Sequence, residues 1–157
     1  MTAARSVNFD IERVSSIAIE ALTGLKDRAG DPVYWHGSEM AWDLERAGKS
    51  TTTVAVALLH DVLEDSDWDA KRLVHELIHR GSSKLAEKAE LIVQNVMVLT
   101  RRQGQETYDQ YIDRIKESSD IATTVKIEDI RHHLKYSKNI PNSLIKRYVK
   151  ALEKLTS

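Results

Sequence analysis

The segment "VALLHDVLEDSDW", Val56–Trp68, begins as an apolar helix and then places four ionisable side chains within two helical turns: His60, Asp61, Glu64 and Asp65. Residues three or four positions apart share a helix face, so these side chains are expected on one polar side at the end of a buried helix. Unpaired carboxylates are costly to bury, and the negative end of the helix dipole adds to that cost. A divalent cation bound by imidazole and carboxylate would offset this cost of burial. The segment alone also allows the alternative that this end of the helix is exposed to solvent.

Helical periodicity continues on both sides of this segment and predicts an all-α fold. Alternating β patterns, internal repeats and long linkers are missing from the sequence. We therefore expect one domain over residues 1–157, a compact helical bundle. The expected helices cover residues 10–25, 38–48, 50–65, 67–81, 82–99, 107–118, 120–134 and 142–155. Asp10 is the expected N-cap of the first helix, which places Leu25 on its apolar stripe, and Ile78 is expected to face inward with Leu73 and Leu77.

Two further segments carry residues that match the chemistry of the first. "KDRAGDPVYWHGS", residues 26–38, contains two glycines and a proline and is expected to be a loop that carries His36. Asp129 lies in "TVKIEDIRHHL", on a predicted helix with a partly apolar face. Together with His60 and Asp61, they form a set of two histidines and two carboxylates from three separated segments.

Composition excludes several classes of function. The 157 residues suit one domain with a real core, and 41% hydrophobic with 30% charged residues is ordinary for a globular protein. A net charge of -1 gives no electrostatic reason to bind duplex nucleic acid or an anionic membrane. Cysteine is absent, so no thiolate can bind metal or act as a nucleophile. Because no signal-peptide pattern or membrane-length apolar run is found, we expect a soluble, cytoplasmic protein.

These motifs resemble the HD-domain metal-dependent phosphohydrolases, above all the hydrolase domain of the RelA/SpoT-type alarmone enzymes and their small stand-alone relatives. The resemblance runs from about Ile17 to Leu155, nearly the whole chain. "RAGDPVYWH" resembles the family's loop that ends in a ligand histidine, "LLHDVLED" its namesake motif, and "VKIED" its last ligand motif. "VMVLT" and "ETYDQYIDRI" resemble its threonine-ended and tyrosine-rich helices, in the same order.

The resemblance implies a role for each matching residue. The metal ligands would be His36, His60, Asp61 and Asp129, and the ion is expected to be Mn²⁺, with Fe²⁺, Co²⁺ or Zn²⁺ as alternatives. Glu64 and Asp65 would help to activate the water that attacks phosphorus. The implied substrate is a small nucleotide or a related phosphate ester or pyrophosphate, similar to (p)ppGpp. The expected substrate-binding residues are Arg28, Lys126, Arg131 and His133, each of which has an idle surface position as its alternative.

The sequence departs from the family pattern around the substrate rather than at the metal ligands. Asp27 and Arg28 stand where the alarmone hydrolases tend to have Arg-Lys, and an aspartate cannot serve a phosphate. Gly37 replaces the usual proline after the ligand histidine, and His133 replaces an asparagine four residues after the last ligand. The family's reaction class is therefore expected more firmly than ppGpp itself as the substrate.

Two other functions compete with the phosphohydrolase. "HELIH", His75–His79, matches the H-E-x-x-H pattern in which two histidines bind Zn²⁺ and Glu76 acts as the base of a metalloprotease. No downstream third ligand is recognisable, and the alternative is a surface histidine pair. The third hypothesis is a catalytically degenerate HD domain that binds a nucleotide. The sequence also leaves the formation of a homo-oligomer open, because apolar stripes do not reveal which face meets a partner.

Overall fold

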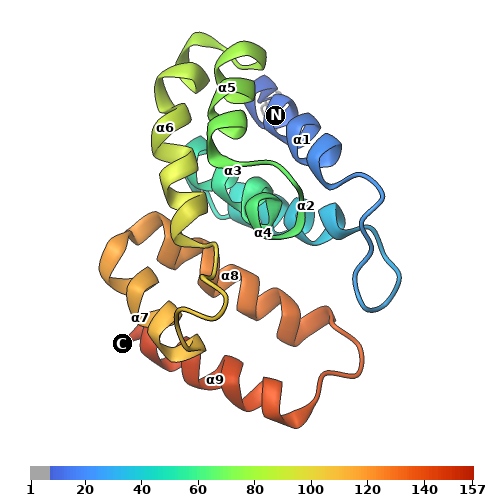
Figure 1. The fold of residues 1–157 in the computed structure, drawn as a ribbon, viewed down its shortest axis with the longest axis vertical. Helices are drawn as coiled ribbons and strands as arrows, with labels where there is room; N and C mark the ends of the chain where they lie inside the picture. Colours follow the sequence, from blue (N-terminus) through green and yellow to red (C-terminus); the bar gives the residue numbers. More distant parts are fainter. Residues whose placement is uncertain (1–7) are drawn as a thin grey trace, which may run out of the picture.

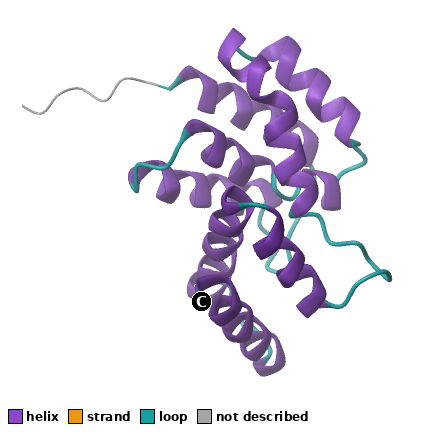
Figure 2. Ribbon diagram, turned by 90° about the vertical axis from the view of Figure 1, so that its left-hand side faces the viewer, coloured by secondary structure: helices purple, strands orange, loops and turns teal. Residues whose placement is uncertain are grey.

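The computed structural model describes residues 8–157, and this part of the chain contains helices, loops and one isolated β-bridge between Lys26 and Pro32. The predicted all-α fold is confirmed (Figures 1 and 2). The helices are α1 (Phe9–Leu22), α2 (Val33–Arg46), α3 (Thr51–Leu59), α4 (Val62–Asp65), α5 (Ala70–Arg80), α6 (Ser83–Val98), α7 (Tyr108–Ser118), α8 (Asp120–Tyr136) and α9 (Asn142–Thr156). The first seven residues, on which the signal-peptide prediction partly rested, lie outside the described part.

Helix α3 forms the centre of the structure. Each of its residues from Thr53 to Leu59 is buried, and α1, α2, α6 and α8 pack around it. Ser50 caps the helix, because its hydroxyl accepts a hydrogen bond of 3.1 Å from the backbone N–H of Thr53. The β-branched run at the start of α3 favours a strand locally, but an apolar surface on every side suits a helix buried by neighbours.

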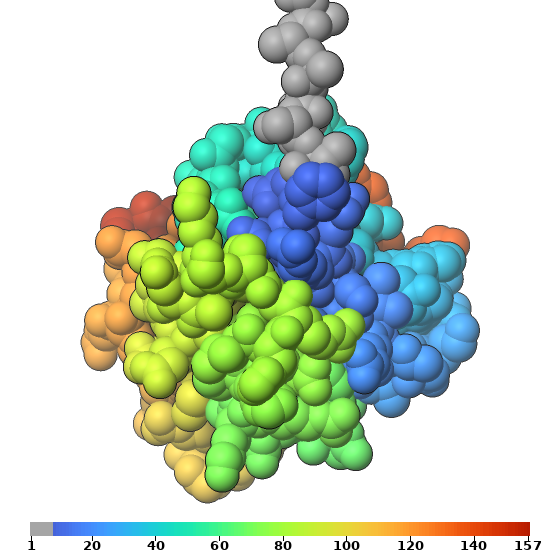
Figure 3. Space-filling model, turned by 90° about the horizontal axis from the view of Figure 1, so that it is seen from above, coloured from blue at the N-terminus to red at the C-terminus, as the bar shows by residue number. Residues whose placement is uncertain are grey.

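The remaining helices cover α3 and extend one end of the structure. In Figure 1, α5 and α6 lie together at one end with α1 beside them, whereas α7, α8 and α9 form the other end. Seen from above in Figure 3, α1, α5 and α6 form much of the outer surface. Within residues 8–157, no helix combines the length and the apolar character that crossing a membrane requires.

Helix α2 begins earlier than predicted, so His36 is a helical residue and not a loop residue. Pro32 precedes the first turn with φ -56° and ψ 130°, which is compatible with a helix start. Gly37 lies inside the helix, where a β-carbon would come within 3.4 Å of the Ala57 carbonyl oxygen. The glycine that suggested a loop instead lets α2 approach the C-terminal end of α3 closely.

The predicted helix over residues 50–65 is divided at the HD motif. Helix α3 ends at Leu59, the backbone turns at His60 and Asp61, and the short α4 follows. The backbone angles of both turn residues stay in the right-handed helical region, so the break is a local tightening. This turn directs the His60 ring toward α8.

Three smaller predictions also fail. Asn8, and not Asp10, caps α1, because the Asn8 side chain accepts hydrogen bonds from the backbone N–H groups of Asp10 and Ile11. Helix α1 ends at Leu22, so Leu25 lies beyond it. Ile78 is 45% exposed because it lies about 100° around the helix from the buried Leu77.

Candidate metal centre

Three side chains from three helices converge where α2, α3 and α8 pack on one another. His36 lies in the first turn of α2, His60 follows the last turn of α3, and Asp129 lies in the second half of α8. His36 Nε2 is 2.7 Å and His60 Nε2 is 3.6 Å from the same atom, Asp129 Oδ1. One ligand atom from each residue lies within 4.8 Å of the other two. Two imidazoles and a carboxylate in this arrangement are suited to hold a divalent ion.

The His60 ring is held with one nitrogen free. Its Nδ1 lies 2.6 Å from the backbone carbonyl oxygen of Ala57, which can only accept a hydrogen bond, so Nδ1 carries a proton. Its Nε2 is fully buried and has no hydrogen-bond partner among the described residues, although Asp61 Oδ1 lies 3.2 Å away. Burial opposes a charge on this ring, but Asp61 and Asp129 outweigh it and raise the pKa of His60 to about 9. The position therefore attracts a cation.

Asp129 is charged although it is buried. Burial alone would raise the pKa of its carboxyl group, but Lys126 and three histidines hold that pKa well below the ordinary value. Lys126 Nζ lies 2.7 Å from Oδ2, which leaves Oδ1 to face the imidazoles. Burial lowers the pKa of His36 despite the nearby carboxylate, which favours the neutral ring that a metal ligand requires.

The other acidic residues of the HD motif line the edge of this cluster. Asp61 contacts His60 and is about one-quarter exposed, so the fourth predicted ligand lies beside the three that converge. Glu64 and Asp65 follow on α4, partly open to solvent. Desolvation and the neighbouring Asp61 and Glu64 raise the pKa of Asp65 to about 6. Desolvation also raises the pKa of Glu64, against a hydrogen bond of 2.5 Å that its Oε1 accepts from the Arg101 backbone N–H.

The four predicted substrate-binding residues are distributed unequally. His133 joins the cluster, with its Nε2 3.2 Å from Asp129 Oδ1 and its ring centroid 4.2 Å from that of His36. Lys126 is buried and paired with Asp129. Arg28 is exposed in the turn before α2 and lies near enough to Tyr148 to oppose the rise that burial causes in the pKa of that residue. The Tyr148 ring in turn stacks on His133, with centroids 5.9 Å apart. Arg131 is exposed on α8 and lies near Glu128 instead, so it is not brought to the cluster.

The structure adds a group of cations that the sequence analysis missed. The guanidinium carbons of Arg101 and Arg147 lie 5.7 Å and 4.9 Å from the ring centroid of Tyr108. Burial raises the pKa of Tyr108, and Lys126 and Asp129 lie near enough to shift it in opposite directions. The Tyr108 hydroxyl and Arg101 Nε are buried with no hydrogen-bond partner among the described residues. Two buried donors among positive charges are suited to bind an anion.

A second missed pair lies behind His36. The Nδ1 atom of His132 is 2.8 Å from His36 Nδ1, and its Nε2 is 2.6 Å from Glu39 Oε2. Spacing contained part of this signal, since Glu39 is three positions after His36 and His132 three after Asp129. That spacing alone does not distinguish His132 from its neighbour His133.

Comparison with solved structures identifies the fold. Several chains match, and one of them is a metazoan ortholog of SpoT that hydrolyzes ppGpp and plays a role in starvation responses. The TM-score is 0.71 at 19% sequence identity, and the match covers 97% of this chain and 86% of the other. The chain has the fold of an HD-domain hydrolase. No protein-family model matches the sequence, and no curated protein matches it either.

Within this HD fold, the competing "HELIH" motif lies on the outer surface. His75 and His79 are exposed on α5 with ring centroids 4.0 Å apart, while Leu73 and Leu77 of the same helix face the core. Glu76 lies 3.4 Å from Arg80, an ordinary pair one helical turn apart. Among the described residues, the metal-ligand geometry is found at His36, His60 and Asp129 and not on α5. No third ligand thus completes a zinc site there.

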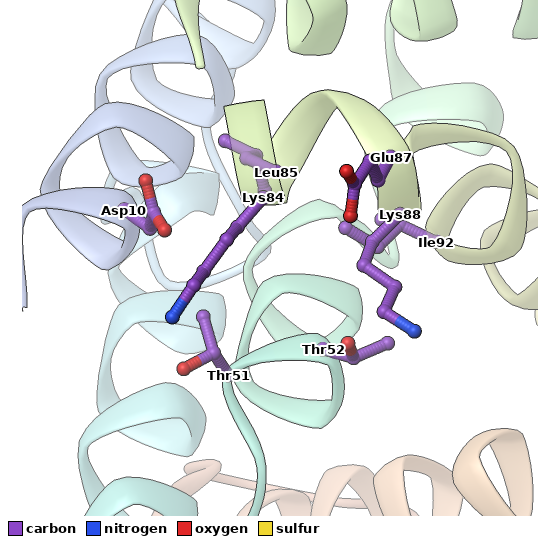
Figure 4. Close-up of a pocket in the computed structure, with 8 residues that line it drawn as sticks. All are labelled: Asp10, Thr51, Thr52, Lys84, Leu85, Glu87, Lys88 and Ile92. Atoms are coloured by element: carbon purple, nitrogen blue, oxygen red, sulfur yellow. The ribbon is translucent and has the colours of Figure 1, made fainter. Parts of the chain in front are cut away.

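A hollow of about 360 Å³ lies away from the cluster, between α1, α3 and α6. Figure 4 shows Lys84 extending across it toward Thr51, with Asp10 on one side and Lys88 on the other. Its lining mixes both signs of charge with hydroxyl groups, and none of the converging histidines contributes to it. The chemistry of this chain therefore concentrates at the junction of α2, α3 and α8.

Proposed function

We propose that this protein is a metal-dependent phosphohydrolase that acts on a small nucleotide or a related phosphate ester or pyrophosphate. The observation that carries the proposal is the His60 ring, whose buried Nε2 lacks a hydrogen-bond partner within residues 8–157 and faces Asp129 and Asp61. A buried polar atom without a partner is unfavourable unless a ligand completes it. The HD fold of a protein that hydrolyzes ppGpp supports the same reaction class.

The donor set fits a divalent ion of the first transition row. His36, His60 and Asp129 would bind it directly, and Asp61 lies beside them as the fourth ligand. Nitrogen and oxygen donors without thiolate favour Mn²⁺, with Fe²⁺, Co²⁺ and Zn²⁺ as alternatives. When bound, such an ion would make a water molecule more acidic and offset the charge of a phosphate group.

The acidic residues of α4 are proposed to handle the proton. Glu64 and Asp65 follow Asp61 by three and four positions, so the same turn that holds the ligand also positions both carboxylates. A carboxylate there accepts the proton of the attacking water. The backbone N–H of Arg101 orients Glu64 through a 2.5 Å hydrogen bond, which connects this group to the loop that carries Arg101.

The substrate class follows from the cations beside the cluster. Arg101 and Arg147 lie against the Tyr108 ring, and Lys126 lies 2.7 Å from Asp129. A chain with a net charge of -1 thus gathers positive charge next to one buried site. Guanidinium groups suit the oxygens of phosphate, and several of them suit a substrate with more than one phosphate. A guanosine polyphosphate such as ppGpp is therefore the first substrate to test.

The deciding experiment combines metal analysis with a substrate panel. Metal-stripped protein is supplied with Mn²⁺, and the release of phosphate or pyrophosphate is measured from ppGpp, deoxynucleoside triphosphates and nucleoside monophosphates. We expect turnover of at least one nucleotide, its loss on chelation, and its loss in Asp61→Ala. Asp67→Ala is the matched control, because Asp67 is an exposed aspartate just beyond α4 and is expected to leave turnover unchanged.

Three results would contradict the proposal in different ways. Tight nucleotide binding without turnover in Mn²⁺-loaded protein indicates a degenerate binding domain. Peptide cleavage that depends on His79 indicates the protease. A protein that binds neither Mn²⁺ nor Zn²⁺ has no metal centre at this junction.

A further inference from the structure

A line of hydrogen bonds leads from the metal-facing His36 to the surface. His36 Nδ1 lies 2.8 Å from His132 Nδ1, and His132 Nε2 lies 2.6 Å from Glu39 Oε2. The two end residues are three positions apart on α2, and α8 supplies the ring between them. The His132 side chain is 7% exposed, so this contact is shielded from water over most of its length.

The acceptor at the outer end determines where the protons of this line lie. A carboxylate can only accept, so His132 must donate from Nε2 to Glu39. A neutral His132 then has its lone pair on Nδ1 and accepts a hydrogen bond from His36 Nδ1–H. His36 is thereby left with its lone pair on Nε2, which lies 2.7 Å from Asp129 Oδ1, so a cation bound by both atoms would take the place of the proton that this pair otherwise shares.

We propose that Glu39 and His132 are positioning residues that hold His36 in the tautomer a metal ion requires. The inference rests on the proposed function, because it assigns the orientation of one ligand of that site. Ligand histidines commonly donate their second N–H to a carboxylate or carbonyl, which fixes the ring and makes its free nitrogen more basic. Here a second histidine transmits that effect from a carboxylate to the ligand.

The surroundings hold this line in place and leave its outer end accessible. The Tyr136 ring lies 4.7 Å from that of His132. The Glu39 side chain is 58% exposed and lines a hollow of about 460 Å³ with Trp42, Asp43 and Tyr136. Removing an exposed carboxylate is expected to cost little stability, so Glu39 can be tested without unfolding the protein.

The two ligand histidines reach the same tautomer by different means. His60 donates from Nδ1 to the Ala57 carbonyl, a backbone group that no side-chain substitution removes. His36 donates to a side chain whose own orientation depends on Glu39. Substitutions at His132 or Glu39, which do not contact the proposed metal position, are consequently expected to change how strongly His36 binds the metal.

The test measures metal affinity and the proton on His36 separately. Calorimetric titration of the metal-stripped full chain with Mn²⁺ compares wild type with Glu39→Ala, Glu39→Gln and His132→Phe. We expect Glu39→Ala and His132→Phe to weaken Mn²⁺ binding by about 10- to 100-fold. Glu39→Gln should weaken it less, because its amide oxygen still accepts a hydrogen bond. The matched control is Glu45→Ala, an exposed glutamate on the same helix, which should leave affinity unchanged.

A spectroscopic measurement separates positioning from a purely structural role. In zinc-loaded protein with ¹⁵N-labelled histidine, the proton on His36 Nδ1 should exchange slowly with water. It should exchange rapidly in His132→Phe, where its acceptor is gone. A loss of thermal stability in the metal-free variants, with neither affinity nor this signal changed, would overturn the proposal.

The outcomes also distinguish this inference from the proposed function. If the wild-type protein binds Mn²⁺ through Asp129 and the Glu39 and His132 variants bind it equally well, the positioning role of Glu39 and His132 is refuted and the proposed function stands. Wild-type protein that binds no divalent ion refutes both. If His132→Phe fails to fold, the affinity and the His36 Nδ1–H exchange of Glu39→Ala decide, because Glu39 is exposed.

Discussion

Two histidine pairs of this chain are candidate metal ligands in the sequence, and the structure places them in different surroundings. His75 and His79 belong to one helix, lie side by side and remain exposed on α5. His36 and His60 come from different helices and meet at a buried carboxylate, with ring centroids 5.3 Å apart. The first pair satisfies a recognised spacing, whereas the second satisfies the physical requirements of a site: convergence, burial and a donor without a partner.

The difference lies in what each charge has around it. On α5, water solvates the two histidines, so they need no binding partner in the protein. The H-E-x-x-H spacing can therefore occur there by chance. At the junction of α2, α3 and α8, desolvation makes each unpaired charge expensive, so Lys126 and the histidines are arranged around Asp129. Buried charged groups that are paired with specific partners therefore support a functional site more strongly than a match to a sequence motif does.

The largest expected effect comes from removing the carboxylate that the junction shares. Asp129→Ala should abolish Mn²⁺ binding and turnover, and it should destabilise the protein by about 3–5 kcal/mol because Lys126 stays buried without its partner. Calorimetry, phosphate release and urea unfolding measure the three effects. Adding Lys126→Met should recover stability without recovering Mn²⁺ binding. Full activity in Asp129→Ala would remove the basis for ranking the buried pair above the exposed one.

A second contrast concerns two exposed arginines with different neighbours. Arg147 lies against Tyr108 beside the cluster, whereas Arg131 is exposed near Glu128. Arg147→Ala should raise the KM for a polyphosphate nucleotide by about tenfold or more, as expected for a lost charge-assisted hydrogen bond, with a smaller change in kcat. Arg131→Ala should leave both constants unchanged. Steady-state kinetics that reverse this order would place the substrate on the other side of α8.

A third contrast compares two Arg–Glu pairs that differ in burial. Glu106 is 9% exposed and accepts hydrogen bonds of 3.0 Å and 2.7 Å from Arg114, whereas the Glu76 side chain is 23% exposed and meets Arg80 at 3.4 Å. Glu106→Gln should cost about 1.5–3 kcal/mol of stability. Glu76→Gln should cost at most about 0.5 kcal/mol, because its contact with Arg80 is long and Arg80 keeps Glu20 as a second partner.

The pH dependence of the buried pair has a definite sign. Hydrogen bonds from Arg114 lower the pKa of Glu106 to about 2, below its ordinary value of 4.5 in the unfolded chain. Its stabilising contribution is therefore complete above about pH 4.5 and is lost as the pH falls toward 2. Urea unfolding over this range should show the difference between wild type and Glu106→Gln shrink with acidity. A difference that stays constant would mean that the charge on Glu106 contributes nothing.

Local patterns in the sequence were sufficient to predict the fold. Helix periodicity depends on neighbours within a few turns, which is why α5 to α9 lie close to their predicted ranges. The early start of α2 and the break at His60 depend on the close approach of α2 to the end of α3, which no local pattern contains. Because a glycine serves a turn and a tight helix contact equally well, Gly37 was assigned to the wrong one.

The site was predictable only where its residues belong to ordered motifs. His36, His60 and Asp129, which the structure brings together, were selected because three motifs occur in one order along the chain. Arg147 and His132 were missed because their roles depend on which face of α9 and α8 points inward. Arg131, one position before His132, was selected on proximity to a motif and lies outside instead.

The smallest expected effect is the most direct test of the comparison. His79→Ala should leave Mn²⁺ affinity and turnover unchanged and alter stability by no more than about 0.5 kcal/mol, because the side chain is exposed and, among residues 8–157, belongs to no group with metal-ligand geometry. His60→Ala is the corresponding substitution at the junction of α2, α3 and α8, and it should abolish Mn²⁺ binding and turnover. If His79→Ala abolished Mn²⁺ binding and His60→Ala did not, the metal would bind at the exposed "HELIH" motif. Burial of the His60 imidazole would then no longer identify the metal site of this protein.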